Sequence, residues 1–454
     1  MRAHIFLATL LALAAAAPAR AQQTSLAPTP PMGWNSWDAY GLTINEQQFR
    51  ANVDVLAHQL KPFGWTYAVI DEGWYLKDPQ AADKVKAAEY VRDDYGRHMP
   101  AVNRFPSAAN NLGLKPLADY VHSLGLQFGI HIVRGIPREA VTQNVPIAGS
   151  TFHMQEAADT TDACPWNKEN YGVRDNAAGQ AWYDSLMKQY ASWDVDYIKV
   201  DCISSHPYKG DEIRMVHLAI QHSGRPMILS LSPGPTPLDK AAEVAANAQL
   251  WRISDDFWDM WDKPTGQGSF SPGLKNQIAT IAAWEPFAKP GNWPDADMLP
   301  VGWLGPVPGF GKARNSLLTP DEQQTLLTMW SIGRSPLILG ANLTKLDEST
   351  TDLITNHEVL SVDQHSTGNR VAFSSTHVQA WTAQATDKAG TYLAVFNLGD
   401  DADSLNVSFK VLGLDGKQYQ VRDLWRRQNL GSWKNCKIQI PPHASRLLLL
   451  LNLK

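Results

Sequence analysis

Carboxylate side chains stand at the ends of several apolar runs in this chain, and two of these groups include a cation. Lys199 and Asp201 end the run that begins at Tyr197, and Arg252 precedes the adjacent pair Asp255 and Asp256. Two carboxylates across one pocket can break a glycosidic bond, because one attacks the anomeric carbon while the other protonates the leaving oxygen. This chemistry needs one ionised and one protonated carboxyl group, which neighbouring charges can set.

Other polar or aromatic residues occupy equivalent positions, close to the ends of further apolar runs: Trp37, Asp71, Glu72, Trp74, His131, Ser232, Asp295 and Asp297. A single Asp after a strand is most often a helix cap or a turn residue, but recurrence of the pattern favours a shared site. Trp37 and Trp74 fit either a core position or a sugar-stacking platform. Asp259 and Asp262 are interpreted as parts of a solvated loop. We expect Lys199 to favour the charged form of Asp201, and Asp255 to raise the pKa of Asp256.

The elements that would position these residues alternate between strand and helix. Strand-like runs cover residues 32–37, 67–74, 127–135, 197–202, 227–232, 250–256, 293–299 and 336–343, and helix-like stretches cover 44–60, 114–124, 178–193, 211–222 and 320–332. Thr43 and Glu46 are spaced as a capping box for the first helix. Eight such strands predict an α/β fold, a (β/α)8 TIM barrel over residues 22–364, which gathers strand ends at one mouth. A doubly wound sheet is the competing fold, but its usual phosphate-loop motifs are missing.

The pattern changes after Gln364, where short β-rich runs follow one another without a long helix. These runs cover residues 370–373, 378–381, 391–398, 405–409, 418–424, 437–440 and 445–451. They predict a small C-terminal antiparallel β-sandwich over residues 365–454.

Composition narrows the class of partner. The 454 residues carry a formal net charge of −5, which argues against nucleic acid or an anionic membrane. The 17 tryptophans suit either sugar stacking or a large aromatic core. The expected partner is therefore an oligosaccharide or polysaccharide substrate, and the oligomeric state stays open.

Residues 1–21 have the pattern of a secretory signal peptide: a basic start, an apolar stretch and the small-x-small site at 19–21. The protein is therefore expected to be secreted or periplasmic, without membrane insertion, because no other run is a transmembrane candidate. An exported protein can form disulfides, and Cys164–Cys202 is one possible bridge among three cysteines. Metal-ligand spacings are absent, so we expect no metal site.

Six motifs in matching order resemble glycoside hydrolase family 27, the family of alpha-galactosidases and alpha-N-acetylgalactosaminidases. They are TPPMGWNSW at 29–37, VIDEGW at 69–74, YIKVDC at 197–202, WRISDDFW at 251–258, WPDADML at 293–299 and MWSIGRSPLILGANL at 329–343. The resemblance covers about residues 28–364, and the family also carries a following sandwich. It implies a retaining double displacement that needs no cofactor.

The resemblance also implies roles for individual residues. Asp201 matches the family's nucleophile, and Asp256, rather than Asp255, matches its acid/base. Lys199 and Arg252 match cations that contact the sugar. Trp37, Asp71, Asp297 and Met298 match the wall of the sugar pocket.

Departures from the family pattern occur at positions that, by the resemblance, surround the sugar and set which sugar is accepted. Glu72 replaces the second of two aspartates, Ser232 stands where many alpha-galactosidases have a glutamate, and His131 replaces a tyrosine. The resemblance thus favours an alpha-galactosidase that removes terminal alpha-D-galactosyl residues. A β-L-arabinopyranosidase is the second reading, since the longer Glu72 could fill the space of the sugar's C6, and another alpha-glycosidase is the third. The alternative from another class is a non-catalytic carbohydrate-binding protein.

Overall fold

The structure is a computed structural model that describes residues 26–79, 89–264 and 270–452. The predicted signal peptide, residues 1–21, lies outside the described residues.

Eight parallel strands form a closed barrel. The sheet has the order β10-β9-β8-β7-β3-β2-β1-β13, and it closes because Leu299, just beyond β10, pairs in parallel with Leu339 of β13. The strands are β1 (Met32–Asn35), β2 (Tyr67–Ile70), β3 (Gln127–Val133), β7 (Tyr197–Asp201), β8 (Ile228–Leu231), β9 (Leu250–Arg252), β10 (Trp293–Asp295) and β13 (Leu337–Leu339). Each lies within one of the predicted runs, so the barrel is confirmed. Their nearly complete burial explains why they read as continuous apolar runs.

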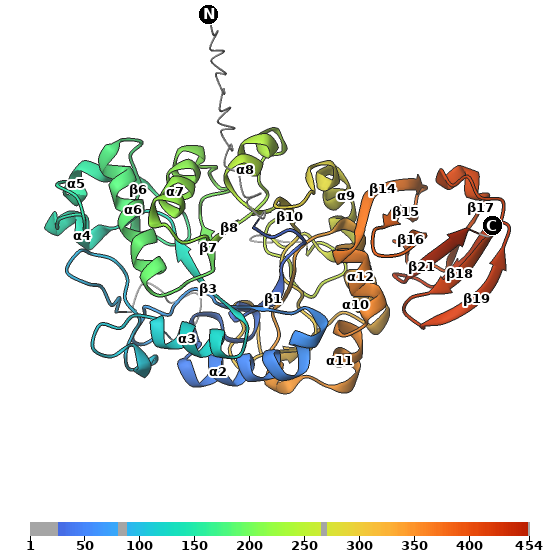
Figure 1. Cartoon of the computed structure of the whole chain (residues 1–454), viewed down its shortest axis with the longest axis horizontal. Helices are drawn as coiled ribbons and strands as arrows, with labels where there is room; N and C mark the ends of the chain where they lie inside the picture. Colours follow the sequence, from blue (N-terminus) through green and yellow to red (C-terminus); the bar gives the residue numbers. More distant parts are fainter. Residues whose placement is uncertain (1–25, 80–88, 265–269, 453–454) are drawn as a thin grey trace, which may run out of the picture.

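Helices cover the outside of the strands, as Figure 1 shows for α2, α3, α6 and α7. They are α2 (Glu46–Val55), α3 (Lys115–Ser123), α6 (Ala177–Ser192), α7 (Gly210–Ser223), α8 (Ala241–Asn247), α9 (Leu274–Trp284), α10 (Pro320–Gly333), α11 (Glu348–Ile354) and α12 (His357–Gln364). The five predicted helices form, and α8, α9, α11 and α12 are additional. None of the described helices combines the length and apolarity needed to cross a membrane.

The start of α2 corrects the predicted capping box. The Asn45 side chain accepts from the Gln48 backbone N–H at 2.9 Å, and the Gln48 side chain accepts in return from the Asn45 N–H at 3.2 Å. The Thr43 hydroxyl instead donates to the Tyr40 carbonyl at 2.7 Å. The predicted spacing was wrong because the chain makes one more turn, Gly41–Thr43, before the helix begins.

Two insertions rise from the barrel mouth. Between β3 and α6 lie β4 (Ile136–Pro137), α4 (Arg138–Gln143), α5 (Met154–Ala157), β5 (Ala158–Ala163) and β6 (Asn170–Val173), whose strands form a small antiparallel sheet. Between β10 and α10 lies the hairpin of β11 (Trp303–Leu304) and β12 (Arg314–Asn315). A short helix, α1 (Trp37–Tyr40), follows β1. The helices and strands within these segments were not predicted, and residues of each segment line the cavity described below.

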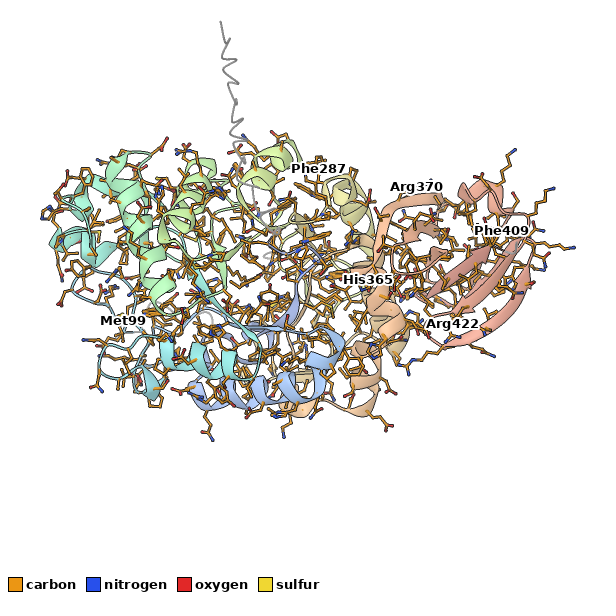
Figure 2. All side chains as sticks on the ribbon, in the orientation of Figure 1. Met99, Phe287, His365, Arg370, Phe409 and Arg422 are labelled. Carbon is orange, nitrogen blue, oxygen red and sulfur yellow. A yellow bond between two sulfur atoms is a disulfide. The ribbon has the colours of Figure 1, made fainter. Side chains whose placement is uncertain are left out.

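The C-terminal strands form the predicted antiparallel sandwich beside α10 and α12 (Figure 1). They are β14 (Ser366–Ser374), β15 (Val378–Ala385), β16 (Thr391–Asn397), β17 (Asp403–Val407), β18 (Tyr419–Asp423), β19 (Gln428–Trp433), β20 (Cys436–Ile440) and β21 (Ser445–Asn452). Phe409, labelled in Figure 2, packs in the sandwich core. Arg422, also labelled, joins the sandwich to the barrel through a two-pronged ion pair with Glu358 of α12, at 2.7 and 2.6 Å.

Candidate active site

A cavity of about 720 Å³ opens at the carboxyl ends of the barrel strands. Its lining includes every predicted site residue: Trp37, Asp71, Glu72, His131, Lys199, Asp201, Ser232, Arg252, Asp256 and Asp297. The barrel therefore brings together side chains that are far apart in the sequence. Their individual roles stay predictions.

An ion pair between Asp71 and Lys199 lies at the buried end of the cavity. Asp71 Oδ2 accepts from Lys199 Nζ at 2.8 Å and from the Asn35 side-chain amide at 2.7 Å. Burial alone would raise the pKa of Asp71, but Lys199 and His131 outweigh it and hold that pKa well below its usual range. Burial alone would lower the pKa of Lys199, but the Asp71 carboxylate outweighs burial and raises that pKa. Both groups are therefore charged and suited to bind sugar hydroxyls.

The carboxylate of Asp201 has different neighbours from those expected. Its Oδ2 accepts from the indole N–H of Trp166 at 3.1 Å and lies 3.9 Å from His131 Nε2. Burial lowers the pKa of His131, so that imidazole is neutral at pH 7. Lys199, which was expected to favour the charged form of Asp201, makes its described ion pair with Asp71, so that expectation stays a prediction. The indole N–H of Trp166 is the side-chain donor that the described residues place on the Asp201 carboxylate.

Glu72 is a buried acid that points into the cavity. Its Oε1 accepts from the Asn167 side-chain amide at 2.7 Å, and the residue is 8% exposed. Burial raises the pKa of Glu72 to about 8, with further increases from Asp201 and Asp71. The group is therefore mostly protonated at pH 7, unlike the ionised Asp71 beside it.

Arg252 organises the opposite wall. Its Nη2 lies 2.7 Å from Asp297 Oδ2 and 3.3 Å from Asp256 Oδ1. The Phe257 backbone N–H also donates to Asp297 Oδ2 at 2.7 Å, which fixes the turn that carries Asp256. The Asp256 side chain is 45% exposed, so it faces the mouth rather than the floor.

The Asp255 side chain has a described partner at the mouth of the cavity. Its carboxylate lies 2.9 Å from His206 Nε2. The expected effect of Asp255 on Asp256 stays a prediction.

Sequence reasoning missed Trp166 and Asn167, which contact Asp201 and Glu72. Both lie in the insertion between β5 and β6. A disulfide between Cys164 and Cys202 ties this loop to the residue after Asp201. The bridge was one open possibility in the sequence, and a cysteine beside each of two pocket segments is the signal that could have located the loop.

The disulfide gives a first prediction. The double variant Cys164→Ser, Cys202→Ser is expected to lose about 10- to 100-fold in kcat/KM, because Trp166 and Asn167 lose their fixed positions. Steady-state kinetics of the folded variant measures this loss. Cys436→Ser is the control, since that free thiol lies in the sandwich. Equal activity of the double variant and wild type would contradict the loop's role.

Asp38 also lines the cavity and was not predicted. It is 1% exposed, and its Oδ2 has no hydrogen-bond partner among the described residues. Burial raises the pKa of Asp38 well above its usual range, with Asp297 adding to the shift. Burial therefore disfavours a negative charge on Asp38 at the buried end of the cavity.

Three other sequence interpretations have clear outcomes. Trp74 is fully buried and donates to the His131 carbonyl at 2.9 Å, so it is a core residue and not a sugar platform. Asp295 accepts from the Asp297 backbone N–H at 2.9 Å and supports that turn. Asp259 is not solvated: it is 2% exposed and pairs with Arg314.

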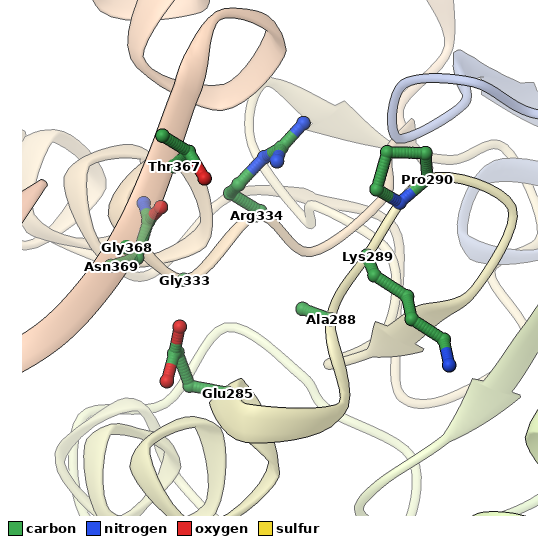
Figure 3. A pocket seen from close by; sticks show the side chains of 9 residues that line it. All are labelled: Glu285, Ala288, Lys289, Pro290, Gly333, Arg334, Thr367, Gly368 and Asn369. Carbon is green, nitrogen blue, oxygen red and sulfur yellow. The ribbon is translucent and has the colours of Figure 1, made fainter. Parts of the chain in front are cut away.

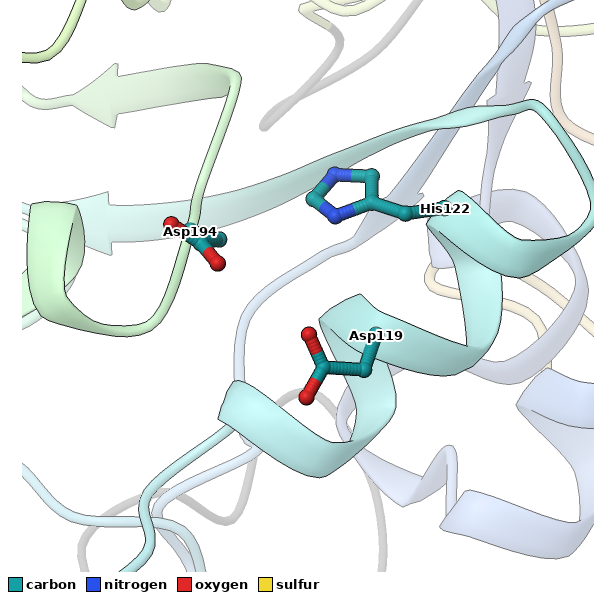
Figure 4. A group of neighbouring side chains, drawn as sticks. All are labelled: Asp119, His122 and Asp194. Atoms are coloured by element: carbon teal, nitrogen blue, oxygen red, sulfur yellow. The ribbon is translucent and has the colours of Figure 1, made fainter.

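Two further groupings lie away from this cavity. A small hollow of about 110 Å³ separates the 285–290 segment from β14, with Glu285 and Arg334 on its walls (Figure 3). Asp119, His122 and Asp194 cluster near the surface (Figure 4). Lys115 and Arg225 already pair with the Asp194 carboxylate, at 3.1 and 3.0 Å. A bound cation there would meet two positive side chains, so the cluster is an ion-pair network.

A closed barrel whose mouth gathers several carboxylates, two cations and aromatic residues in one cavity defines the class of a barrel glycoside hydrolase. A family model described as alpha galactosidase A matches residues 174–365, and one described as the alpha galactosidase C-terminal beta sandwich domain matches residues 375–450.

Individual relatives belong to the same class of enzyme. A solved β-L-arabinopyranosidase of family 27 from Geobacillus stearothermophilus is 44% identical, with a TM-score of 0.89, over 94% of this chain and 97% of that one. Alpha-galactosidase I from Mortierella vinacea is 25% identical, with a TM-score of 0.71, over 95% and 98%. The alpha-galactosidase of Cyamopsis tetragonoloba is 27% identical over 94% of this chain and 87% of its own length. The chain belongs to glycoside hydrolase family 27, as its motifs predicted.

Proposed function

We propose that this enzyme hydrolyses β-L-arabinopyranosides in preference to α-D-galactopyranosides, with net retention of configuration. The observation that carries the proposal is the buried Glu72 side chain, which the Asn167 amide holds in the sugar pocket. This order reverses the one that the sequence favoured. It is supported by the 44% identity to an enzyme named a β-L-arabinopyranosidase, against 27% or less for the alpha-galactosidases compared above.

The chemistry follows from the placement of two carboxyl groups. Asp201 attacks the anomeric carbon and forms a covalent glycosyl-enzyme bond, while Asp256 gives its proton to the departing oxygen. Water then attacks the same carbon, Asp256 takes back a proton from that water, and Asp201 is released. Lys199, Asp71 and Arg252 hold the sugar, and Trp166 keeps Asp201 oriented.

Specificity arises from the space around Glu72. β-L-Arabinopyranose has the ring and hydroxyl arrangement of α-D-galactopyranose without the hydroxymethyl group. The side chain of Glu72 is one methylene longer than the aspartate usual at this position, and its amide contact fixes it in place. Since the acid is mostly neutral at pH 7, it fills this space without adding a charge and keeps a proton to donate to a sugar hydroxyl.

Alpha-galactosidase activity is the second candidate. It is favoured by the descriptions of both matching family models and by the names of the curated relatives. The family, together with carboxylates at both catalytic positions, favours either enzyme over a non-catalytic carbohydrate-binding protein.

The proposal is tested by following each p-nitrophenyl glycoside by proton NMR. The expected first product is the β anomer of L-arabinose, which then mutarotates. Initial release of the α anomer would contradict retention. Release of galactose with little arabinose would support the second candidate instead.

We also propose that the protein is exported. The signal-like pattern of residues 1–21 supports this, and a disulfide is typical of oxidising compartments. N-terminal sequencing of protein recovered outside the cytoplasm should begin at Gln22. An uncleaved protein confined to the cytoplasm would contradict the proposal.

The pKa of Glu72 gives a pH prediction. As pH rises through about 8, Glu72 ionises beside Asp201 and Asp71, and Lys199 offsets the cost of that buried charge only in part. We expect kcat/KM for the arabinoside to fall by about tenfold per pH unit above this value. Glu72→Gln, which mimics the neutral acid, should lack the part of this fall that Glu72 causes and keep only the part due to loss of the Asp256 proton. A wild-type profile that is flat to pH 10 would contradict the assignment.

The same group affects stability with a defined sign. Between its ordinary pKa of 4.5 and about 8, folded Glu72 keeps a proton that the unfolded chain releases. The free energy of unfolding should therefore decline as pH rises through this window, and decline less in Glu72→Gln. Denaturant titrations at pH 5 and pH 8.5 measure the difference.

A further inference from the structure

Large aromatic side chains are unusually exposed at the rim of the cavity. Phe270 and Phe310 are 38% and 43% exposed, and both line the cavity together with Trp258. The ring centroids of Phe310 and Trp258 lie 5.4 Å apart, as do those of Phe310 and Phe270. Phe270 and Phe310 form one exposed surface, here called the aromatic ledge, which is backed by the Trp258 ring that is itself only 2% exposed. Exposed apolar patches of this kind mark binding surfaces.

The ledge is held in place by a buried ion pair. Asp259 accepts from Arg314 Nε at 2.9 Å and from Arg314 Nη2 at 2.5 Å. Arg314 Nη1 also donates to the Phe310 carbonyl at 3.0 Å, and the Leu317 backbone N–H donates to Asp259 at 2.9 Å. The Asp259 carboxylate therefore clamps the β11–β12 hairpin, which carries Phe310, onto the segment that carries Trp258.

The ledge lies on the side where a leaving group departs. Trp258 closely follows Asp256, the side chain assigned to protonate the leaving oxygen, and Asp256 is half exposed at the mouth. The sugar-binding pair Asp71 and Lys199 lies deeper, with both side chains largely buried. Since Asp256 and the ledge line the same cavity, a group that leaves past Asp256 departs through a space that the ledge also borders.

The chemistry of the ledge limits what it can bind. Phenylalanine rings have no hydrogen-bonding atoms, and Phe270 and Phe310 meet at 79°, which makes an apolar corner rather than one flat face. A second sugar would lose hydrogen bonds to water by placing its hydroxyl groups there. The nearby polar groups His206 and Asp255 already bond to each other at 2.9 Å.

We propose that the aromatic ledge is a leaving-group subsite that takes an aromatic or other apolar aglycone in preference to a second sugar. The inference rests on the proposed function, because it uses Asp256 as the acid. It extends that function from the sugar to the rest of the substrate.

The test compares three substrates that carry the same sugar: the glycosyl fluoride, the 2-naphthyl glycoside and a disaccharide. The fluoride leaving group is too small to extend from the reaction centre to the ledge. In Phe310→Ala, the ratio of kcat/KM for the naphthyl glycoside to that for the fluoride should fall about tenfold from wild type, since ring contact is lost. The disaccharide-to-fluoride ratio should change by less than about twofold, because the hydroxyl groups of a second sugar gain little from an apolar surface. Phe310→Leu should restore part of the naphthyl ratio.

Leu317→Ala is the matched control, because Leu317 lies on the same segment, is 67% exposed and is not part of the cavity lining. It should leave both ratios unchanged. A naphthyl ratio unaffected by Phe310→Ala overturns the subsite, and a larger fall in the disaccharide ratio overturns the preference for apolar groups.

Calorimetric binding of the naphthyl glycoside to the Asp201→Asn protein separates this inference from the catalytic proposal. Phe310→Ala in that background should weaken binding about tenfold if the ledge contacts the aglycone. This binding test stays valid even if kinetic measurements assign the catalytic roles to other carboxylates. Equal affinity with and without Phe310 would overturn the subsite on its own.

Discussion

Replacing Asp201 by Asn is expected to lower kcat/KM for p-nitrophenyl β-L-arabinopyranoside by about 10⁴- to 10⁶-fold. The amide cannot attack the anomeric carbon, although the contacts that hold the sugar remain. The fold should be intact, because Asp201 stands at the end of β7 with its side chain in the cavity. Stopped assays at high enzyme concentration, with thermal unfolding as a check on folding, measure the effect.

Azide distinguishes the two carboxylates. In Asp201→Ala, azide should restore turnover and give the glycosyl azide of inverted configuration, because it replaces the nucleophile in a single displacement. In Asp256→Ala, azide should attack the glycosyl-enzyme and give the azide of retained configuration. Asp255→Ala is the control and should lose only a few fold. The reverse pattern of azide products would exchange the assignments of Asp201 and Asp256.

Shortening Glu72 to Asp is expected to raise the ratio of galactoside to arabinoside kcat/KM by about 100-fold. One methylene in an apolar pocket is worth about 10- to 200-fold in selectivity, and the shorter acid opens space for a hydroxymethyl group. It also withdraws the carboxyl group from the Asn167 amide, now 2.7 Å from Glu72 Oε1. Initial rates with both p-nitrophenyl glycosides measure the change.

Glu72→Gln keeps the side-chain length and should therefore keep the arabinoside preference. An unchanged ratio in Glu72→Asp would show that another part of the pocket selects the sugar. Ser232 is the next residue to substitute, because it also lines the cavity and departs from the usual glutamate.

The barrel was predictable because its strands are buried on both faces and end in polar residues. The sequence thus placed Asp201 and Asp256 near strand ends that line one cavity, and their catalytic roles stay predictions. Helices without a long apolar stripe were not identified: α8, for example, is short and rich in alanine. The strand β19 was missed because it is largely polar and exposed.

Contacts between distant segments could not be predicted in this way. Asp259 reads as a loop residue until Arg314, far along the chain, is placed against it. Trp166 and Asn167 reach the site only because a small sheet and the Cys164–Cys202 bridge fold their loop over the mouth. Likewise, Lys199 was expected beside Asp201, and only the barrel geometry shows that it faces Asp71.

The central claim is that the pocket around Glu72 selects a pentopyranose. Its most direct test is paired hydrolysis of p-nitrophenyl β-L-arabinopyranoside and p-nitrophenyl α-D-galactopyranoside by purified protein without residues 1–21. We predict that kcat/KM for the arabinoside exceeds that for the galactoside by about tenfold or more, the lower end expected for one methylene. A preference for the galactoside would contradict the claim and show that Glu72 still accommodates the hydroxymethyl group.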